Sequence, residues 1–270
     1  MRSCEDVLGA RPGNNGADLA WEGKTTAVRA AAISVDPDEF SALAASDAVV
    51  EAERRLVESR PEHLILRVDR TDPSKNVVRG LRAFELFLQA RPDWHGRVGM
   101  LALLDPSRQE IPAYAAYREA IETTAAEINE RFGRQGWTPL ELRIGDDFPG
   151  SVAAYKQFDV LLVNAVFDGL NLVAKEAPLV NERDGVVVLS ENAGAYEEIG
   201  QWALGVNPFD VAGQARALHE ALVMASEERR RRREAICGHV REHDISSWVS
   251  IQLAAIDEAG ERARRTLERS

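Results

Sequence analysis

The sequence of 270 residues contains little cysteine and no long hydrophobic run. Its two cysteines, Cys4 and Cys237, lie far apart without metal-ligand spacing, which favours a reducing compartment. No apolar stretch approaches the ~20 residues needed to span a bilayer. The N-terminus "MRSCEDVLGARPGNNG" has no apolar segment of the kind found in secretory signals. We therefore expect a cytoplasmic protein with no membrane association.

Positive charge is in the minority, with 33 Lys and Arg against 44 Asp and Glu and a net charge of -11. Because nucleic-acid binding needs a basic surface, no nucleic-acid partner is expected. This balance still allows a local basic pocket for a phosphorylated ligand. The basic run from Arg229 to Arg233 is flanked by Glu227, Glu228 and Glu234. It therefore predicts a solvated, salt-bridged helix face.

Two common nucleotide-binding motifs are absent. The chain has no G-x-G-x-x-G, which argues against a nicotinamide or flavin cofactor, and no G-x-x-x-x-G-K-[ST], which argues against an ATPase or kinase. The string "HVREH" at 239–243 matches H-x-x-E-H, but no third zinc ligand is apparent. We therefore expect neither a metal nor a cofactor.

The residues that are present indicate a globular α/β protein. Hydrophobic residues make up 45% of the chain and charged residues 29%. Apolar strands alternate with helical patterns, and the expected strands are 24–35, 63–69, 97–104, 138–144, 159–165 and 185–190. Several are apolar on both faces, which is typical of a parallel sheet covered by helices on both sides. Three C-terminal helices are expected at 209–226, 227–243 and 246–267. The predicted fold is a Rossmann-like sheet followed by these helices.

Candidate site residues come from the loops that follow the strands. Right-handed crossovers place the C-terminal ends of parallel strands at one edge of a sheet, where ligands of such folds bind. The first loop, "VDRTDPSKN", carries Arg70 and Lys75 just before a helix. Because a helix N-terminus also favours anions, these cations could form a phosphate clamp, although two solvated charges would explain them equally well. Arg108 follows the next strand and adds a third cation.

The segment "FDGLNLVAKEA" is the second part of the predicted site. Gly169 would allow a tight turn, and a helix beginning near Asn171 would direct N–H groups at a diphosphate. Asp168 could accept hydrogen bonds from sugar hydroxyls, and Glu176 could accept those of a ribose. The alternative is a capped helix with a partly buried, paired glutamate. The later loop "SENAGAYEE" predicts a second anion site of the same kind, with Gly194 at a helix start.

These segments carry a family resemblance. The chain resembles the C-terminal, donor-binding half of the trehalose-6-phosphate synthases, which are retaining glycosyltransferases of the GT-B type in glycosyltransferase family 20. The wording around "EAPLVNERDG" is similar to the actinobacterial branch, and the resemblance covers about residues 20 to 260. The motifs that carry it occur in this order: "VDRTDPSKN", "PSR", "RFGRQGWTPLEL", "FDGLNLVAKEA", "VLSENAGAYEEIG", "VNPFD" and "REHDISSW".

The resemblance implies glucosyl transfer from UDP-glucose or GDP-glucose to glucose 6-phosphate, giving trehalose 6-phosphate. Arg70 and Lys75 would be the catalytic residues, because they would stabilise charge on the leaving diphosphate. The other implied contacts are Asp168 and Gly169 with glucose hydroxyls, the backbone of Asn171, Leu172 and Val173 with phosphate oxygens, Glu176 with the ribose, Arg108 with the acceptor phosphate, and Ile144 and Phe148 with the base.

The sequence departs from the family at two points. Phe167 stands where the family usually has arginine, so the related pseudo-glycosyltransferases that couple cyclitols remain an alternative. In addition, only about 60 residues precede "HLILRVD", too few for an acceptor domain of ordinary size. The expected division is a remnant of that domain and a linker at 1–60, the donor-binding domain at 61–245 and a crossing helix at 246–270.

The chain is therefore expected to be a half-enzyme, inactive alone. Its partner would be a chain supplying the N-terminal half, or a second copy in a homo-oligomer. A non-catalytic module that binds nucleotide sugars and pairs with another chain is the alternative from a different functional class. The sequence leaves open the choice between UDP and GDP, and the oligomeric state.

Overall fold

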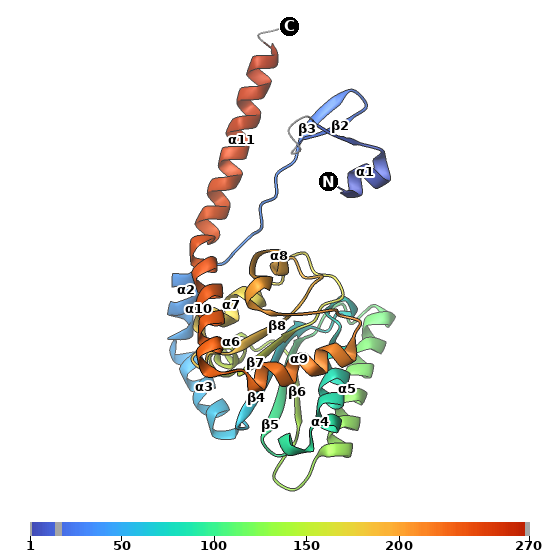
Figure 1. Cartoon of the computed structure of the whole chain (residues 1–270), viewed down its shortest axis with the longest axis vertical. Helices are drawn as coiled ribbons and strands as arrows, with labels where there is room; N and C mark the ends of the chain where they lie inside the picture. The colour runs from blue at the N-terminus through green and yellow to red at the C-terminus, as the bar shows by residue number, and fades with distance from the viewer. Residues whose placement is uncertain (1, 14–17, 268–270) are drawn as a thin grey trace. The chain divides into compact units, whose positions relative to one another are not determined.

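The computed structural model describes residues 2–13 and 18–267. The chain divides into two compact units, one formed by Val35–Glu242 and the other by Met1–Ser34 with His243–Ser270. Figure 1 labels the elements of both units. Each unit is described by itself below.

The larger unit contains one parallel six-stranded sheet, which confirms the predicted fold class. Its strands lie in the order β6-β5-β4-β7-β8-β9. Their bounds are β4 (His63–Arg70), β5 (Val98–Asp105), β6 (Leu140–Ile144), β7 (Val160–Val163), β8 (Val186–Ser190) and β9 (Leu204–Val206). The short strand β9 was not predicted, because three residues carry too little pattern to be recognised.

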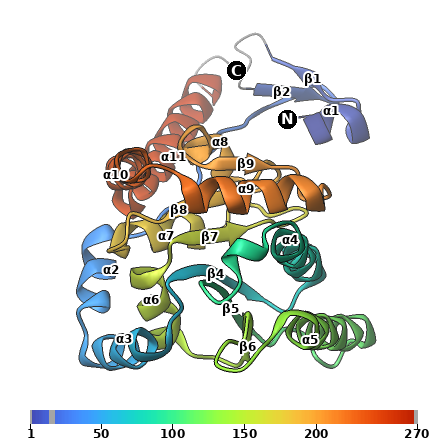
Figure 2. The same cartoon turned by 60° about the horizontal axis from the view of Figure 1, so that its bottom comes forward.

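Helices cover both faces of this sheet, and alternate strand residues supply each face. Leu64 and Leu66 of β4 pack in one hydrophobic core, and Ile65 between them packs in the other. The first face is covered by α2 (Pro37–Ala44), α3 (Asp47–Ser59), α6 (Phe148–Gln157), α7 (Val173–Val180), the short α8 (Ala195–Ile199) and α10 (Ser226–Glu242). The second face is covered by α4 (Val77–Ala90), α5 (Pro112–Phe132) and α9 (Val211–Val223). Figure 2 shows α3 and α6 on one side of the strands and α4 and α5 on the other.

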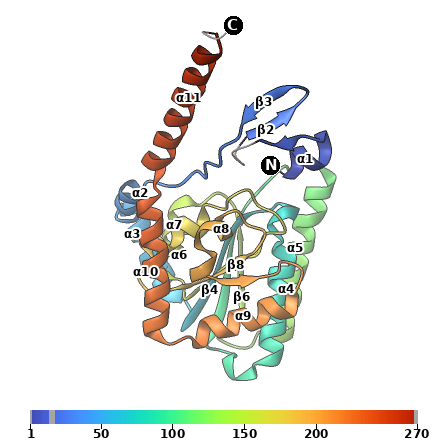
Figure 3. The ribbon, with the colours of Figure 1, turned by 45° about the horizontal axis from the view of Figure 1, so that its top comes forward.

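The strand order fixes where a ligand can enter. The chain moves outward from β4 through β5 to β6, and then returns to place β7 on the other side of β4. The crossovers on the two sides of β4 therefore leave a crevice beyond the C-terminal ends of β4 and β7, which is the topological switch point of such a sheet. Figure 3 shows strands β4 and β8 between α6 and α7 on one side and α4 on the other.

The smaller unit has an antiparallel sheet and a long helix. Its elements are α1 (Arg2–Leu8), β1 (Arg11–Pro12), β2 (Asp18–Trp21), β3 (Lys24–Ala27) and α11 (Ile245–Leu267). The strand predicted at 24–35 is wrong beyond Ala27, because residues 28–35 have no regular structure. Trp248 of α11 donates to the Ala31 carbonyl over 3.2 Å. On α11, Ile251, Leu253 and Ile256 are exposed.

The boundaries of the two observed units differ from the predicted domain boundaries at residues 60 and 245. Phe40 of α2 and Val49 and Leu56 of α3 pack in the same core as Leu64 of β4, so residues 35–60 belong to the larger unit. The interpretation of residues 1–60 as the remnant of another domain stays a prediction. Among the residues described, no helix is long and apolar enough to cross a membrane.

Candidate functional site

A cavity of about 260 Å³ lies at the switch point of the sheet. It brings together residues that follow different strands and lie up to about a hundred positions apart in the chain. Seven of the predicted site residues line it, namely Arg70, Lys75, Phe148, Asn171, Leu172, Val173 and Glu176. The cavity is therefore the candidate site, and its chemistry follows from the groups that line it.

Lys75 and Asp168 form an ion pair across the switch point. Lys75 ends the short 3-10 helix Pro73–Lys75 that follows β4, whereas Asp168 lies in the loop that follows β7. The Lys75 ammonium is also 3.9 Å from the carboxylate of Asp69. The Lys75 and Asp168 side chains are 14% and 16% exposed, so little water screens the pair. The pair places a cation at the cavity, between the loops that follow β4 and β7.

Asn171 determines where the loop before α7 turns into the helix. Its φ of 70° lies in the left-handed region, which asparagine tolerates better than most residues. The helix consequently begins at Val173, two residues later than predicted, with Leu172 as its N-cap. The N–H groups of Asn171 and Leu172 make no hydrogen bond within the described part of the chain, and that of Val173 is a free first-turn donor. These three residues line the same cavity as Lys75.

The Asn171 side chain ties this loop together. Its amide nitrogen donates to the Asp168 carboxylate over 3.2 Å. Its amide oxygen is buried and has no partner among the described residues. The carboxylate of Asp168 is thus held by an ammonium and an amide. Neither Asp168 nor Gly169 is among the residues that line the cavity.

The two glycines of the site lie in loops that contact each other. Gly169 lies in a bend, but it is not among the residues with positive φ, and the left-handed position of this loop is at Asn171. A Cβ on Gly194 would lie 2.0 Å from the Gly169 carbonyl oxygen. The Gly194 N–H donates to the Asp168 carbonyl over 2.9 Å, and the Ala195 N–H donates to Leu170. The expectation that this loop repeats an anion site is therefore wrong, because its N–H groups hold the neighbouring loop.

Glu176 lies in the first turn of α7 with its carboxylate at the cavity. Burial raises its pKa above the usual value for a glutamate. It makes no ion pair in the described ranges 2–13 and 18–267, so the predicted alternative of a paired glutamate is not supported. Tyr155 of α6 lines the same cavity, and burial, together with the Glu176 carboxylate, raises its pKa well above the usual value. The carboxyl of Glu176 and the phenol of Tyr155 thus give the cavity two buried hydrogen-bonding groups.

Not every predicted residue lies at the cavity. Arg70 is exposed at the end of β4 and lines it. Arg108 is exposed, donates to the Tyr114 hydroxyl over 3.1 Å and does not line the cavity. Ile144 is half-buried against the α4–α5 core, so only Phe148, which is 51% exposed, is available to a base there.

The sequence analysis missed six residues of the lining. They are Val68, Asp69, Asp105, Asp146, Ser151 and Tyr155. Asp105 is the last residue of β5, so the strand-end rule that identified Arg70 could also have identified it. Tyr155 lies in the last turn of α6, where nothing in the local pattern separates a lining residue from a core residue.

Other charged features found in the sequence are accounted for by ion pairs. Arg230 and Arg233 pair with Asp184, and Arg231 and Arg232 pair with Glu228, so the predicted salt-bridged helix face is confirmed. In the "HVREH" string, His239 lies 3.5 Å from Glu198. No group of three His, Cys, Asp or Glu side chains is placed to hold a metal ion in the portion of the chain described.

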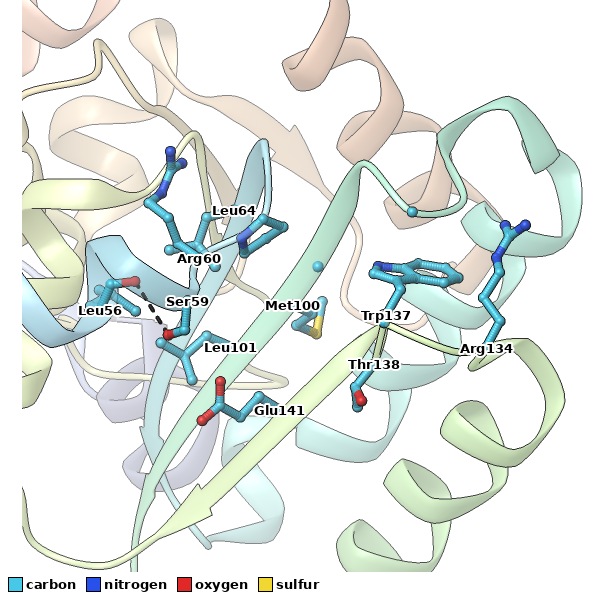
Figure 4. Close-up of a pocket in the computed structure, with 14 residues that line it drawn as sticks. Leu56, Ser59, Arg60, Leu64, Met100, Leu101, Arg134, Trp137, Thr138 and Glu141 are labelled. Atoms are coloured by element: carbon cyan, nitrogen blue, oxygen red, sulfur yellow. Dashed lines mark hydrogen bonds between the residues drawn. The ribbon is translucent and has the colours of Figure 1, made fainter.

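A larger cavity of about 580 Å³ lies at the opposite edge of the sheet, where β4, β5 and β6 begin. Figure 4 shows Arg60, Met100, Trp137 and Glu141 around it. Arg60 pairs with Asp159 at 2.7 Å, and the Trp137 ring N–H donates to the Val98 carbonyl over 2.8 Å. None of the predicted site residues lines this cavity.

The chain matches glycosyltransferase family 20 over residues 1–258. It belongs to that family. Among curated relatives, the trehalose-6-phosphate synthase of Sinorhizobium fredii is 38% identical over 214 residues, which cover 78% of this chain and 45% of that protein. The validamine 7-phosphate valienyltransferase of Streptomyces hygroscopicus subsp. jinggangensis is 38% identical over 207 residues, which cover 75% of this chain and 39% of that protein.

Solved structures of the family share the fold. The UDP-forming alpha,alpha-trehalose-phosphate synthase from Burkholderia xenovorans, in complex with glucose-6-phosphate, superposes with a TM-score of 0.85 at 32% identity. The match covers 94% of this chain and 58% of that one. The chain thus spans about half the length of the relatives it matches, and its parallel sheet and C-terminal helices correspond to part of a trehalose-phosphate synthase.

Proposed function

We propose that the switch-point cavity binds the nucleoside diphosphate of a sugar donor. The chain would supply the donor-binding half of a retaining glycosyltransferase that moves glucose from UDP-glucose or GDP-glucose to glucose 6-phosphate, forming trehalose 6-phosphate. The observation that carries the proposal is the Lys75–Asp168 pair beside the free N–H groups of Asn171, Leu172 and Val173. A cation and a helix start there suit the diphosphate of such a donor, and a hydroxyl acceptor suits its sugar.

The residues divide the donor between them. Lys75 and the exposed Arg70 would bind the diphosphate and stabilise the charge that it gains as the bond to glucose breaks. Asp168, with Gly169 beside it, would accept hydrogen bonds from glucose hydroxyls, and Glu176 would accept those of the ribose. Phe148 would pack against the base.

The acceptor side of the proposal rests on weaker support from this chain. The Burkholderia xenovorans synthase was solved with glucose-6-phosphate, and Arg108 is an exposed cation in the loop that follows β5. We propose that Arg108 leaves Tyr114 to meet the acceptor phosphate. The same proposal includes a cytoplasmic location and no need for a metal or cofactor. It also includes pairing with an N-terminal-half chain or a second copy.

Calorimetric titration of UDP and GDP into the chain tests the donor site. We expect saturable binding of at least one nucleotide. Lys75→Ala should weaken that binding by about 10- to 100-fold, because a hydrogen bond to a charged group contributes about 1.5–3 kcal/mol. Absence of binding by the folded parent would overturn the proposal, and unchanged affinity in Lys75→Ala would overturn the role of Lys75.

Lys156→Ala is a matched control for that variant. Lys156 is 12% exposed and pairs with Glu53 on α3, so it resembles Lys75 in burial and in having a carboxylate partner. It does not line the cavity. Its replacement should lower the melting temperature without changing nucleotide affinity, which separates lost packing from lost ligand contact.

A second function is favoured by one observation. The valienyltransferase shares 38% identity with this chain, and Phe167, at 75% exposed, stands beside Asp168 where a cation was expected. Product analysis of the chain paired with an N-terminal half, supplied with nucleotide-activated glucose or nucleotide-activated cyclitol, separates the two. Trehalose 6-phosphate supports the synthase, whereas a product from the activated cyclitol alone supports the alternative.

A further inference from the structure

Arg67 is an arginine in the middle of the central strand β4, and its side chain is fully buried. Buried arginine is unusual, since removing a guanidinium from water is costly unless all its groups find partners. Among the described residues, only its Nη2 has partners, whereas Nε and Nη1 have none. Stability of the core alone therefore does not account for a charged side chain at this position.

The contacts of Arg67 point toward Lys75. Its Nη2 donates to the Asp69 carboxylate over 2.8 Å and to the Lys75 carbonyl oxygen over 2.6 Å. The Asp69 side chain is 5% exposed and lies 3.9 Å from the Lys75 ammonium. Arg67 thus holds both the backbone of Lys75 and the carboxylate that faces its ammonium. Charges alternate along the series Arg67, Asp69, Lys75 and Asp168, from the core to the cavity.

Gly80 makes the room for this arrangement. It lies inside α4, where glycine is among the least favourable residues. A Cβ at this position would lie 2.2 Å from Arg67 Nη1, so any other residue would displace the guanidinium. A buried, incompletely paired arginine and a glycine inside a helix are each unfavourable, and both serve the same contact with Lys75.

We propose that Arg67 is a positioning residue, which fixes the Lys75 ammonium for the donor diphosphate through Asp69 and through the Lys75 carbonyl. This inference rests on the proposed function, because it assigns a means of holding the cation of the same site. Arg67 itself does not line the cavity, so it acts on the ligand only through Lys75.

A double-mutant cycle between Arg67 and Lys75 tests the inference. Arg67→Lys keeps the charge that faces Asp69, but one ammonium lacks the fixed fork that bonds two acceptors. Nucleotide dissociation constants are measured for the parent, Arg67→Lys, Lys75→Ala and the double variant, by calorimetry or by NMR titration where binding is weak. Arg67→Lys should weaken binding by about 3- to 30-fold in the parent and by less than about 2-fold in Lys75→Ala.

Equal weakening in both backgrounds would overturn the inference, because Arg67 would then act through the general fold. Unchanged affinity in Arg67→Lys would overturn it as well. The proposed function fails separately, if the folded parent binds neither UDP nor GDP. Arg229→Lys is the control for losing a guanidinium fork, because Arg229 bonds the Asp184 carbonyl over 3.0 Å and lies outside the cavity. It should leave affinity unchanged.

Gly80→Ala tests the same contact without changing charge and stands in if Arg67→Lys does not fold. Alanine favours the helix, yet its Cβ would push Arg67 away from Lys75. We expect weaker nucleotide binding in Gly80→Ala, by about 3-fold or more, and no further effect in the Lys75→Ala background. Parent-like affinity in Gly80→Ala would contradict the inference.

Discussion

Single residues at the switch-point cavity combine burial with charge. Glu176 is half-buried without an ion-pair partner in the described chain, and burial raises its pKa. An unpaired carboxylate in the wall of a cavity costs stability when it is ionised. That cost is explained if the carboxylate accepts the hydroxyls of a ribose, which satisfy it in the complex.

Glu176→Gln should change the pH dependence of the protein. Because the folded-state pKa of Glu176 is raised, the folded state binds this proton more tightly than the unfolded state. The parent therefore loses stability as pH rises from the unfolded value of 4.5 through the raised pKa. Glu176→Gln should melt higher than the parent at pH 7, with the difference disappearing below pH ~4. Melting temperatures across pH measure this.

Nucleotide affinity gives the second half of that test. In the parent, binding should weaken as pH falls through the raised pKa, since the protonated carboxyl accepts hydroxyls less well. In Glu176→Gln the dependence should flatten and the affinity should be lower at pH 7. The exposed Glu130 of α5 serves as control. If Glu130→Gln changes the profiles as much as Glu176→Gln, burial is not the cause.

At the scale of elements, the site is held by contact between two loops. The loop after β8 donates N–H groups to the loop after β7, and Gly194 touches the Gly169 carbonyl region. This contact allows no Cβ at residue 194. The position of Asp168 therefore depends on a glycine that does not line the cavity.

Gly194→Ala should destabilise the protein by about 1–3 kcal/mol, as overpacking typically does. The φ of Gly194 is -57°, so alanine is conformationally allowed and the effect is steric. Nucleotide affinity should fall with it, because the Asp168 loop must move. Gly238→Ala in α10 is the control, since a Cβ there meets nothing within 4 Å, and it should stabilise by up to about 1 kcal/mol. Equal melting temperatures for the two variants would contradict this account.

Hydrophobic patterns in the sequence predicted most strands and helices. They did not predict backbone conformations or contacts between loops, as Asn171 and Gly194 show. Strands β7 and β8 are buried at every position, so their continuous apolar runs were sufficient. The start of α7 was misplaced because the left-handed φ of Asn171 leaves no mark in the hydrophobic pattern. Gly194 lies at the start of α8, as the sequence analysis expected, but its steric contact with Gly169 could not be predicted, because that contact requires knowledge of the folded loops.

At the scale of the whole molecule, topology assembles the site. Lys75 and Asp168 are 93 residues apart in sequence and meet only because β4 and β7 are neighbours in the sheet. The sequence analysis predicted that the loops after the parallel strands lie at one edge of the sheet. The order of the strands is set by long-range packing, so hydrophobic periodicity could not predict it. The same limitation applies to Arg67, whose role depends on the packing of α4 against β4.

The cavity at the switch point is smaller than the cavity at the opposite edge of the sheet, so the location of the bound nucleotide is the central question. The larger, of about 580 Å³, lies near Leu56 and Trp137, and the smaller, of about 260 Å³, lies at the switch point. Backbone amide NMR of the labelled chain during titration with UDP or GDP decides between them. We predict the largest shift changes at Asn171, Leu172 and Val173. Changes concentrated instead around Leu56 and Trp137 would contradict the account.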